Sequence, residues 1–168
     1  MSNPRHPFRL NVGFIVHEEV GYTAQFHFEF DKLKLGDDLV LKEFSGVVDV
    51  GRTPQGLLFT GQFSATTPLE CARCLKTFDQ RLNWDMTELY AFTEKSVSES
   101  GLMVPEDAKI DLEPIIRDYA LLEIPISPIC QPDCRGLCPE CGQDLNIRDC
   151  GHRPQRDESP FSTLKNLL

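Results

Sequence analysis

The sequence has little positive charge and no long apolar run. Lys and Arg number 17 against 26 Asp and Glu, a formal net charge of −9. This balance excludes a broad basic surface for nucleic-acid phosphates, although it is compatible with a small local patch. No apolar run approaches the roughly 18 residues of a membrane span, and the N-terminal MSNPRHPFRL lacks the apolar region of a signal peptide. We therefore expect a soluble, cytoplasmic protein with no membrane partner.

The common catalytic and nucleotide-binding motifs are also missing. There is no GxSxG, P-loop, GxGxxG or HExxH pattern, and neither half of the H-x-E and P-C-x-x-C deaminase signature is present. Paired carboxylates such as Glu18–Glu19 and Asp37–Asp38 are more typical of solvated turns than of acid–base dyads. We therefore expect a binding protein, not an enzyme, with no catalytic residues, no organic cofactor and no small-molecule substrate.

Apolar residues make up 40% of the chain and 11 residues are Phe, which suffices for a packed core. Residues 1–92 have the composition of β-strands, and Phe26, Phe28 and Phe30 alternate so that they share one face of a strand. A turn over residues 51–56, which contains Gly and Pro, predicts a hairpin. The expected strands cover residues 10–16, 22–30, 40–50, 57–67 and 78–92.

The second half of the chain has a different pattern. Residues 93–108 are polar and predict a surface loop. Asp111 can cap a helix that continues to about Glu123, beyond which Pro125 prevents its extension. The last segment, 160–168, has the pattern of a short amphipathic helix or of a tail that folds on a partner.

Between residues 125 and 152 the chain has little periodic pattern but contains five of its seven cysteines, so we expect metal to replace the missing apolar core. The expected fold class is α+β: an antiparallel β-sheet or partly closed barrel with one main helix and a zinc-stabilised, Cys-rich C-terminal segment. The expected domains are an α+β domain over 1–124, a zinc-binding segment over 125–152 packed on it, and a C-terminal tail or short helix over 153–168.

Seven cysteines, an odd number at short spacings, indicate metal ligands rather than a disulfide framework in a cytosolic chain. CxxC occurs twice, as Cys71–Cys74 just past a strand and as Cys138–Cys141, where Pro139 and Gly142 bend the backbone. This spacing lets two thiolates from one tight turn reach one tetrahedral ion. Thiolates favour Zn²⁺ or iron–sulfur over Mg²⁺ or Ca²⁺.

Zinc prefers four ligands, and adding one histidine gives eight candidates, enough for two Zn²⁺ ions. The predicted metal ligands are Cys71, Cys74, Cys130, Cys134, Cys138, Cys141, Cys150 and His152. The last four form a local C-x2-C-x8-C-x-H loop, and the first four form a long-range site. A single ion is the alternative, held by Cys71/Cys74 with Cys138/Cys141 or by Cys134/Cys138/Cys141/Cys150. Closed four-ligand sites have no open position, which predicts structure rather than catalysis.

A redox function for the Cys71/Cys74 pair is an alternative of another class. A thioredoxin-like site, however, has its CxxC at the head of a helix after a parallel strand. Here the flanking residues have the pattern of antiparallel β-structure. This pattern disfavours the thiol redox hypothesis without removing it.

The sequence resembles the YceD family, the large ribosomal RNA subunit accumulation proteins, over roughly residues 40–168. The similarity is carried by Leu69–Cys74 (LECARC) after a strand, by Leu121–Ile126 (LLEIPI), by the string Cys130–Asn146 (CQPDCRGLCPECGQDLN) and by the closing 160–168. Relatives often end the string in C-x-C, where this chain has Cys-Gly-His at 150–152.

The resemblance implies a role in ribosome biogenesis, with accumulation of large-subunit (23S) rRNA, metal binding and no known enzymatic activity. The charge distribution then bears on the partner, because residues 75–124 carry 11 acidic and 5 basic side chains. A basic large-subunit ribosomal protein, or a pre-ribosomal particle that exposes one, suits this region. Direct binding of rRNA through Arg135, Arg148, Arg153 and Arg156 near the zinc segment is the alternative.

Overall fold

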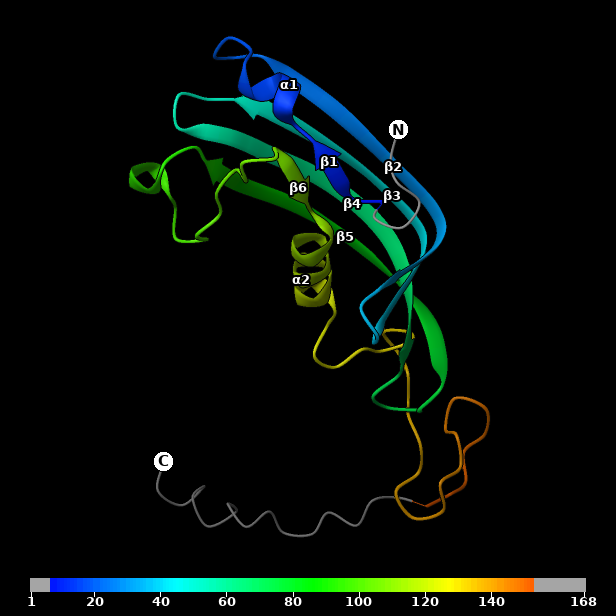
Figure 1. Ribbon diagram of the computed structural model, residues 1–168. Helices are drawn as coiled ribbons and strands as arrows, with labels where there is room; N and C mark the ends of the chain where they lie inside the picture. Colours follow the sequence, from blue (N-terminus) through cyan, green and yellow to red (C-terminus); the bar gives the residue numbers. More distant parts are fainter. Residues whose placement is uncertain (1–6, 153–168) are drawn as a thin grey trace, which may run out of the picture. The chain divides into compact units, whose positions relative to one another are not determined.

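The computed structural model describes residues 7–152 and divides them into two compact units (Figure 1). The first unit comprises residues 7–69 and 78–126, and the second comprises 70–77 and 127–152. The tail or helix expected over 153–168 lies outside the described residues.

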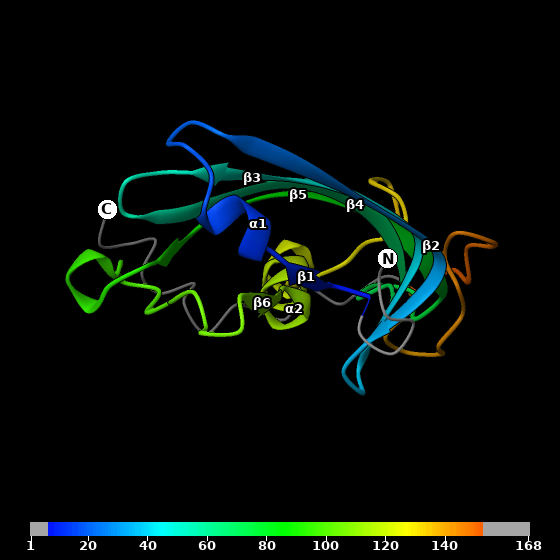
Figure 2. The same ribbon diagram turned by 45° about the horizontal axis from the view of Figure 1, so that its top comes forward.

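A four-stranded sheet forms the body of the first unit, with the strand order β2-β3-β4-β5. The strands are long: β2 spans Thr23–Leu35, β3 Leu39–Arg52, β4 Gly56–Glu70 and β5 Thr77–Ala91. Strands β2 and β3, and strands β3 and β4, pair antiparallel. The sheet is bent but open (Figure 2), so the antiparallel α+β fold is confirmed and the partly closed barrel does not form.

The hairpin expected around residues 51–56 is confirmed between β3 and β4. Thr53 N donates to Gly56 O at 2.9 Å, and Thr53 Oγ1 bonds the same residue, which closes the turn. A side chain at Gly56 would collide with the carbonyl of Tyr90. Glycine is therefore required there by the close approach of β5.

One face of the sheet is apolar and carries the core. Phe28 is buried and Phe26 and Phe30 pack against the same core, which confirms the alternation predicted for this strand. The ring of Phe63 stacks on Trp84 with centroids 5.5 Å apart. The buried apolar residues of the four strands include Leu33, Leu35, Phe44, Val48, Val50, Leu57, Phe59, Phe63, Leu82, Trp84 and Met86.

Shorter elements cover this face: β1 (Arg9–Asn11) pairs antiparallel with β6 (Lys109–Asp111), and α1 (Gly13–Val16) follows β1. The strand predicted over 10–16 is wrong beyond Asn11, whose Oδ1 accepts from Gly13 N at 3.1 Å and starts a helical turn. The loop predicted over 93–108 contains the short η1 (Glu94–Ser96), and β6 follows it. Three-residue strands such as β1 and β6 have no periodicity to detect, because only their mutual pairing defines them.

Helix α2 (Glu113–Glu123) is the predicted main helix. The N-cap position is occupied by Leu112 and not by the predicted Asp111. Asp111 Oδ1 nevertheless accepts from Glu113 N at 3.0 Å and satisfies one N-terminal amide of the helix. Ile116 and Ala120 are buried against the core, one helical turn apart. Among the described residues, no helix has the length and apolar character to cross a membrane.

Candidate metal centres

Four thiols form the first group of candidate ligands, and all belong to the second unit. Cys71 Sγ lies 3.8 Å from Cys134 Sγ, and Cys74 Sγ lies 3.7 Å from Cys130 Sγ. All four sulfur atoms lie within 4.8 Å of one another. Three of them are buried and Cys130 is half-buried, so the group is largely shielded from solvent.

Backbone hydrogen bonds shape the turn that carries Cys71 and Cys74. Leu75 N donates to Cys71 O at 2.9 Å, and Leu75 adopts a left-handed φ of 60° that reverses the chain after the second thiol. Ala72 N donates to Pro128 O at 2.8 Å. This bond holds the second cysteine-bearing segment beside the turn.

Three thiols and one imidazole form the second group. Cys138 Sγ lies 3.9 Å from His152 Nδ1, and the ligand atoms of these residues, Cys141 and Cys150 lie within 4.8 Å of one another. Gly142 N donates to Cys138 O at 2.9 Å with a φ of 70°, a conformation that favours glycine after the CxxC turn. Because Cys141 and His152 are exposed, this group lies closer to solvent than the first.

One thiol of each group has a lowered pKa. In the first group, backbone N–H groups, chiefly that of Cys130, lower the pKa of Cys71 to about 6. In the second group, backbone N–H groups, chiefly that of Cys141, lower the pKa of Cys138 to about 7. Burial, together with the neighbouring sulfurs, raises the pKa of Cys130 to about 12. A cation among the sulfurs would offset the cost of ionising the Cys130 thiol.

The separations between the sulfurs fit one tetrahedral ion. Four sulfurs placed about 2.3 Å from a zinc ion lie about 3.8 Å apart, and in the first group Cys71 Sγ lies 3.8 Å from Cys134 Sγ and Cys74 Sγ lies 3.7 Å from Cys130 Sγ. A disulfide would require about 2.05 Å, and all seven cysteines are free. Both groups could therefore hold a metal ion.

The structure brings together both sets of residues that the spacing predicts. They are Cys71, Cys74, Cys130 and Cys134 in one group, and Cys138, Cys141, Cys150 and His152 in the other. Neither of the mixed groupings expected for a single ion forms among the described residues. His17 and His27 lie outside both groups.

The redox hypothesis for Cys71 and Cys74 gains no support from this geometry. Their exposed fractions are 0% and 4%, so a dithiol or protein substrate has no direct access to either sulfur. They lie in the turn between β4 and β5 rather than at the start of a helix. The lowered pKa of Cys71 is also what a metal-binding thiolate requires.

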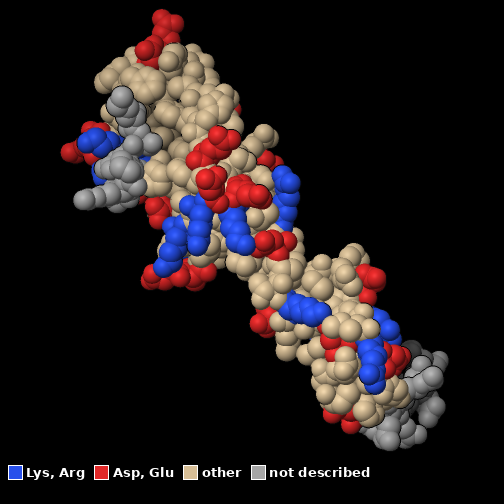
Figure 3. All heavy atoms as spheres, turned by 90° about the vertical axis from the view of Figure 1, so that its right-hand side faces the viewer, with Lys and Arg blue, Asp and Glu red and all other residues tan. Residues whose placement is uncertain are grey.

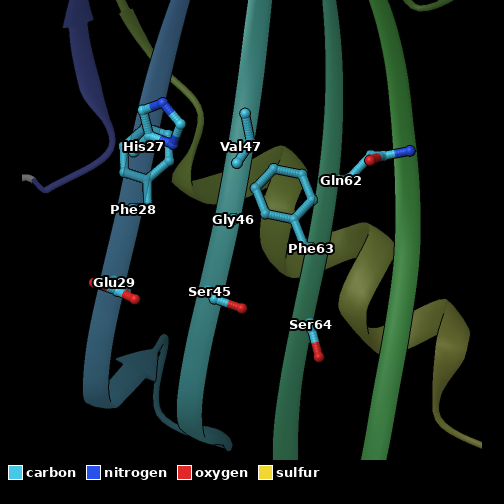
Figure 4. Close-up of a pocket in the computed structure, with 9 residues that line it drawn as sticks. All are labelled: His27, Phe28, Glu29, Ser45, Gly46, Val47, Gln62, Phe63 and Ser64. Carbon is cyan, nitrogen blue, oxygen red and sulfur yellow. The ribbon is translucent and has the colours of Figure 1, made fainter.

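A surface hollow of about 570 Å³ lies on the first unit, over β2, β3 and β4 (Figure 4). His27, Glu29 and Ser45 line it, each from an outward-facing strand position. Within the part of the chain that the structure describes, no hydrogen bond joins these three side chains. Ser64, which also lines the hollow, accepts from Arg81 Nη2 at 3.3 Å, so neither lining serine is hydrogen-bonded to a base in the described structure.

Comparison with known proteins assigns the chain to a family. The family model described as "Large ribosomal RNA subunit accumulation protein YceD" matches residues 59–168, more than half of the sequence. The chain belongs to the YceD family. The resemblance read from the cysteine string is thereby confirmed, and the YceD family is implicated in accumulation of large-subunit rRNA.

Several relatives extend this similarity. An uncharacterized protein of Mycobacterium tuberculosis strain H37Rv is 36% identical over 143 residues, which cover 80% of this chain and 69% of the relative. Uncharacterized protein YlbN of Bacillus subtilis is 26% identical over 153 residues, or 84% and 88% of the two chains.

A plant relative carries the description of the family in its name. The Arabidopsis thaliana protein called large ribosomal RNA subunit accumulation protein YCED homolog 1, chloroplastic, is 40% identical over 63 residues, 38% of this chain and 20% of the plant protein. No solved structure shows a significant match.

Sequence reasoning missed the polar residues that support the first group. Arg73 Nη1 donates to Cys134 O at 2.9 Å, and Asn146 Nδ2 donates to Cys134 Sγ at 3.5 Å. The YceD string contains Asp144 and Asn146, but spacing to a cysteine does not reveal their role. The one available signal in the sequence was the Asp-x-Asn pattern, which is typical of a turn. Residues 144–146 do form such a turn, in which Asn146 N donates to Asp144 Oδ1 at 2.8 Å.

Proposed function

We propose that this chain is a non-enzymatic, zinc-binding factor of ribosome biogenesis that supports accumulation of large-subunit (23S) rRNA. The family description supports a role in accumulation of large-subunit rRNA, and the name of the Arabidopsis relative contains the same words. The composition of the interior of the second unit supports the binding of zinc ions.

Within the described residues, the buried side chains of the second unit are those of Cys71, Cys74, Cys134 and Cys138. Among the described residues of that unit no Leu, Ile or Phe is fully buried, and Ile129, Leu137 and Leu145 are half-buried, so apolar packing contributes little to its stability. Metal coordination can supply the folding free energy that an apolar core would otherwise provide. Two zinc ions would then form the core of this unit.

Zinc is the metal that the ligands suit best. Seven thiolates and one imidazole are soft or borderline donors, and the first group has the separations of a tetrahedron. A bound zinc ion supplies no reaction here, because four protein ligands leave it no open position. The cysteines and His152 would hold the chain in shape, and recognition of a partner would be the activity.

Metal content tests the zinc sites directly. Native mass spectrometry of the reduced, full-length protein should show two zinc ions per chain. Cys130→Ser should lose one ion and His152→Ala should lose or weaken the other. His27→Ala is the matched control, because this histidine lies outside both groups, and it should retain two. Absence of zinc from carefully reduced wild-type protein would contradict the proposal.

The role in rRNA accumulation is tested in cells that lack the gene for this protein. Wild-type protein and His27→Ala should restore the ratio of 23S to 16S rRNA, whereas Cys130→Ser combined with Cys138→Ser should not. Equal rescue by the doubly substituted protein, at equal abundance, would show that the metal groups are dispensable for the function.

The charges favour a basic ribosomal protein, alone or in a pre-ribosomal particle, as the partner. Seven described cationic side chains already lie within 4.0 Å of a carboxylate: Arg9, Lys34, Lys42, Lys76, Lys109, Arg117 and Arg135. On the face drawn in Figure 3, Lys and Arg lie among Asp and Glu and form no broad basic surface. Such a surface gives little affinity for RNA phosphates.

Binding measurements at several salt concentrations separate the two partners. Binding to purified rRNA should be weak, and binding to basic ribosomal proteins should weaken when acidic residues of 75–124 are replaced by Lys. Tight rRNA binding that falls steeply with salt would favour the RNA alternative. A role in ribosome assembly would place the protein in the cytoplasm, while the Arabidopsis relative is named as chloroplastic.

A further inference from the structure

The side chain of Asn146 connects the two candidate metal groups. Asn146 lies in the loop that follows Cys138 and Cys141, which are ligands of the second group. Its Nδ2 nevertheless donates to Sγ of Cys134, a ligand of the first group, at 3.5 Å. Its Oδ1 accepts from the backbone N of Arg135 at 2.7 Å, so both ends of the amide contact the segment around Cys134.

Asp144 fixes the orientation of this amide. Its Oδ1 accepts from both the backbone N and Nδ2 of Asn146, each at 2.8 Å, and its Oδ2 lies 2.6 Å from Lys76 Nζ. The side chain of Asp144 is only 10% exposed. One N–H of Asn146 is thus directed at the carboxylate, which leaves the other for the sulfur of Cys134.

The backbone of the same loop is tied to the first CxxC turn. Leu137 N donates to Arg73 O at 3.1 Å, and Leu145 N donates to Gly136 O at 2.9 Å. The chain that carries the ligands of the second group is therefore held against the turn between Cys71 and Cys74. If this loop becomes more or less ordered, its hydrogen bonds to the residues around the first group change as well.

We propose that Asn146 is a positioning residue for the first metal group and that it couples the loading of the two groups. The inference rests on the proposed zinc binding. A donor to a ligating thiolate fixes the direction of the sulfur and disperses its charge, and such outer partners change metal affinity by about 10–100-fold. Because the ligands of the second ion lie on the loop that carries Asn146, loading the second group raises the affinity of the first, and linkage makes the effect reciprocal.

Titration of the metal-free, full-length protein with Co²⁺ tests this coupling. The two groups are distinguishable by absorption, because four thiolates and three thiolates with an imidazole give different ligand fields and thiolate-to-metal bands. Asn146→Ala should weaken Co²⁺ binding at the four-thiolate group by about 10-fold or more, although it removes no ligand. Asn83→Ala, the same change at an exposed position of β5, is the matched control and should titrate like wild type.

A double-mutant cycle measures the coupling itself. The double substitution Cys138→Ser with Cys141→Ser disables the second group. In protein that retains Asn146 it should weaken metal binding at the first group. In Asn146→Ala protein it should cause little further loss of that affinity. If Asn146→Ala prevents folding of the second unit, Lys76→Gln, which removes the anchor of Asp144 and no ligand, should give a smaller loss in the same direction.

The outcomes separate the two proposals. Wild-type protein that binds two ions, with unchanged affinity in Asn146→Ala and Lys76→Gln, would overturn the positioning role and leave the zinc sites standing. If disabling the second group lowers the metal affinity of the first group equally with and without Asn146, the coupling would be overturned. Wild-type protein that binds no ion would overturn the zinc proposal, and this inference with it.

Discussion

The ring of Phe63 on β4 covers Gly46, its direct partner on β3. A Cβ at Gly46 would lie 2.8 Å from Cε1 of that ring, closer than real side chains approach one another. The same ring stacks on Trp84 of β5, with an interplanar angle of 23°. The missing side chain on β3 thus leaves room for an aromatic ring of β4 that also stacks on β5, so the ring connects three strands in the core.

Gly46→Ala should therefore destabilise the first unit by about 1–3 kcal/mol, the usual cost of overpacking a core. Urea unfolding can be followed by the fluorescence of Trp84, which is the single tryptophan of the chain and stacks on Phe63. Gly51→Ala is the matched control, since the nearest atom to a Cβ there is 3.9 Å away. The control should change stability by no more than about 0.5 kcal/mol. Equal effects of the two substitutions would contradict the account of Phe63.

Zinc binding should release protons, and its affinity should fall as the pH falls. At pH 7 the pKa of about 6 leaves Cys71 mostly ionised in the metal-free protein, whereas the pKa of about 12 keeps Cys130 protonated. The first group should then release at most about three protons per ion, fewer than four ordinary thiols would. Below pH 6 Cys71 also becomes protonated, so the affinity should fall more steeply. Zinc titration in weak buffer with a pH indicator measures the number, and four protons at pH 7 would contradict the lowered pKa.

His152→Cys should preserve the second metal group. The substitution creates the C-x-C ending that the cysteine string often has in relatives, and a thiolate replaces the imidazole at a position already near Cys138. Native mass spectrometry should still show two ions, while His152→Ala, which supplies no ligand, should show one or a readily removed second. Equal ion counts and equal resistance to a chelator in all three proteins would show that residue 152 is not a ligand.

Lys76→Met should loosen the second unit while leaving the first intact. The ion pair between Lys76 and Asp144 joins residues 70–77 to residues 127–152, and the pKa of Asp144 is lowered chiefly by its hydrogen bond with Lys76. The pair is partly open to solvent, so a modest effect is expected. Hydrogen exchange should quicken at the amides of Leu137 and Leu145, with no change in the strands of the sheet. Lys95→Met, on η1 of the first unit, serves as the control and should leave both amides protected.

The sequence predicted the elements that have their own periodicity or turn chemistry. Alternating Phe26, Phe28 and Phe30 indicated which face of β2 is buried, and the turn over residues 51–56, which contains Gly and Pro, indicated the hairpin. Asp111 followed by apolar residues at helical spacing located α2. Strand β6 escaped prediction because three residues have no detectable period. The strand expected over 10–16 is present in β1 only as far as Asn11, where a turn stabilised by the Asn11 side chain replaces it.

The sequence also indicated the candidate ligands, because cysteine spacing reports how many thiols a tight turn can direct at one ion. It favoured their division into two groups of four and left a single site as the alternative. Only the tertiary structure could show that residues 70–77 and 127–152 form one unit whose buried side chains are four cysteines. It alone placed the amide of Asn146 beside Cys134 and the ammonium of Lys76 beside Asp144. Local chemistry selects ligands that are neighbours in the chain, whereas the contacts that orient those ligands depend on segments that only folding brings together.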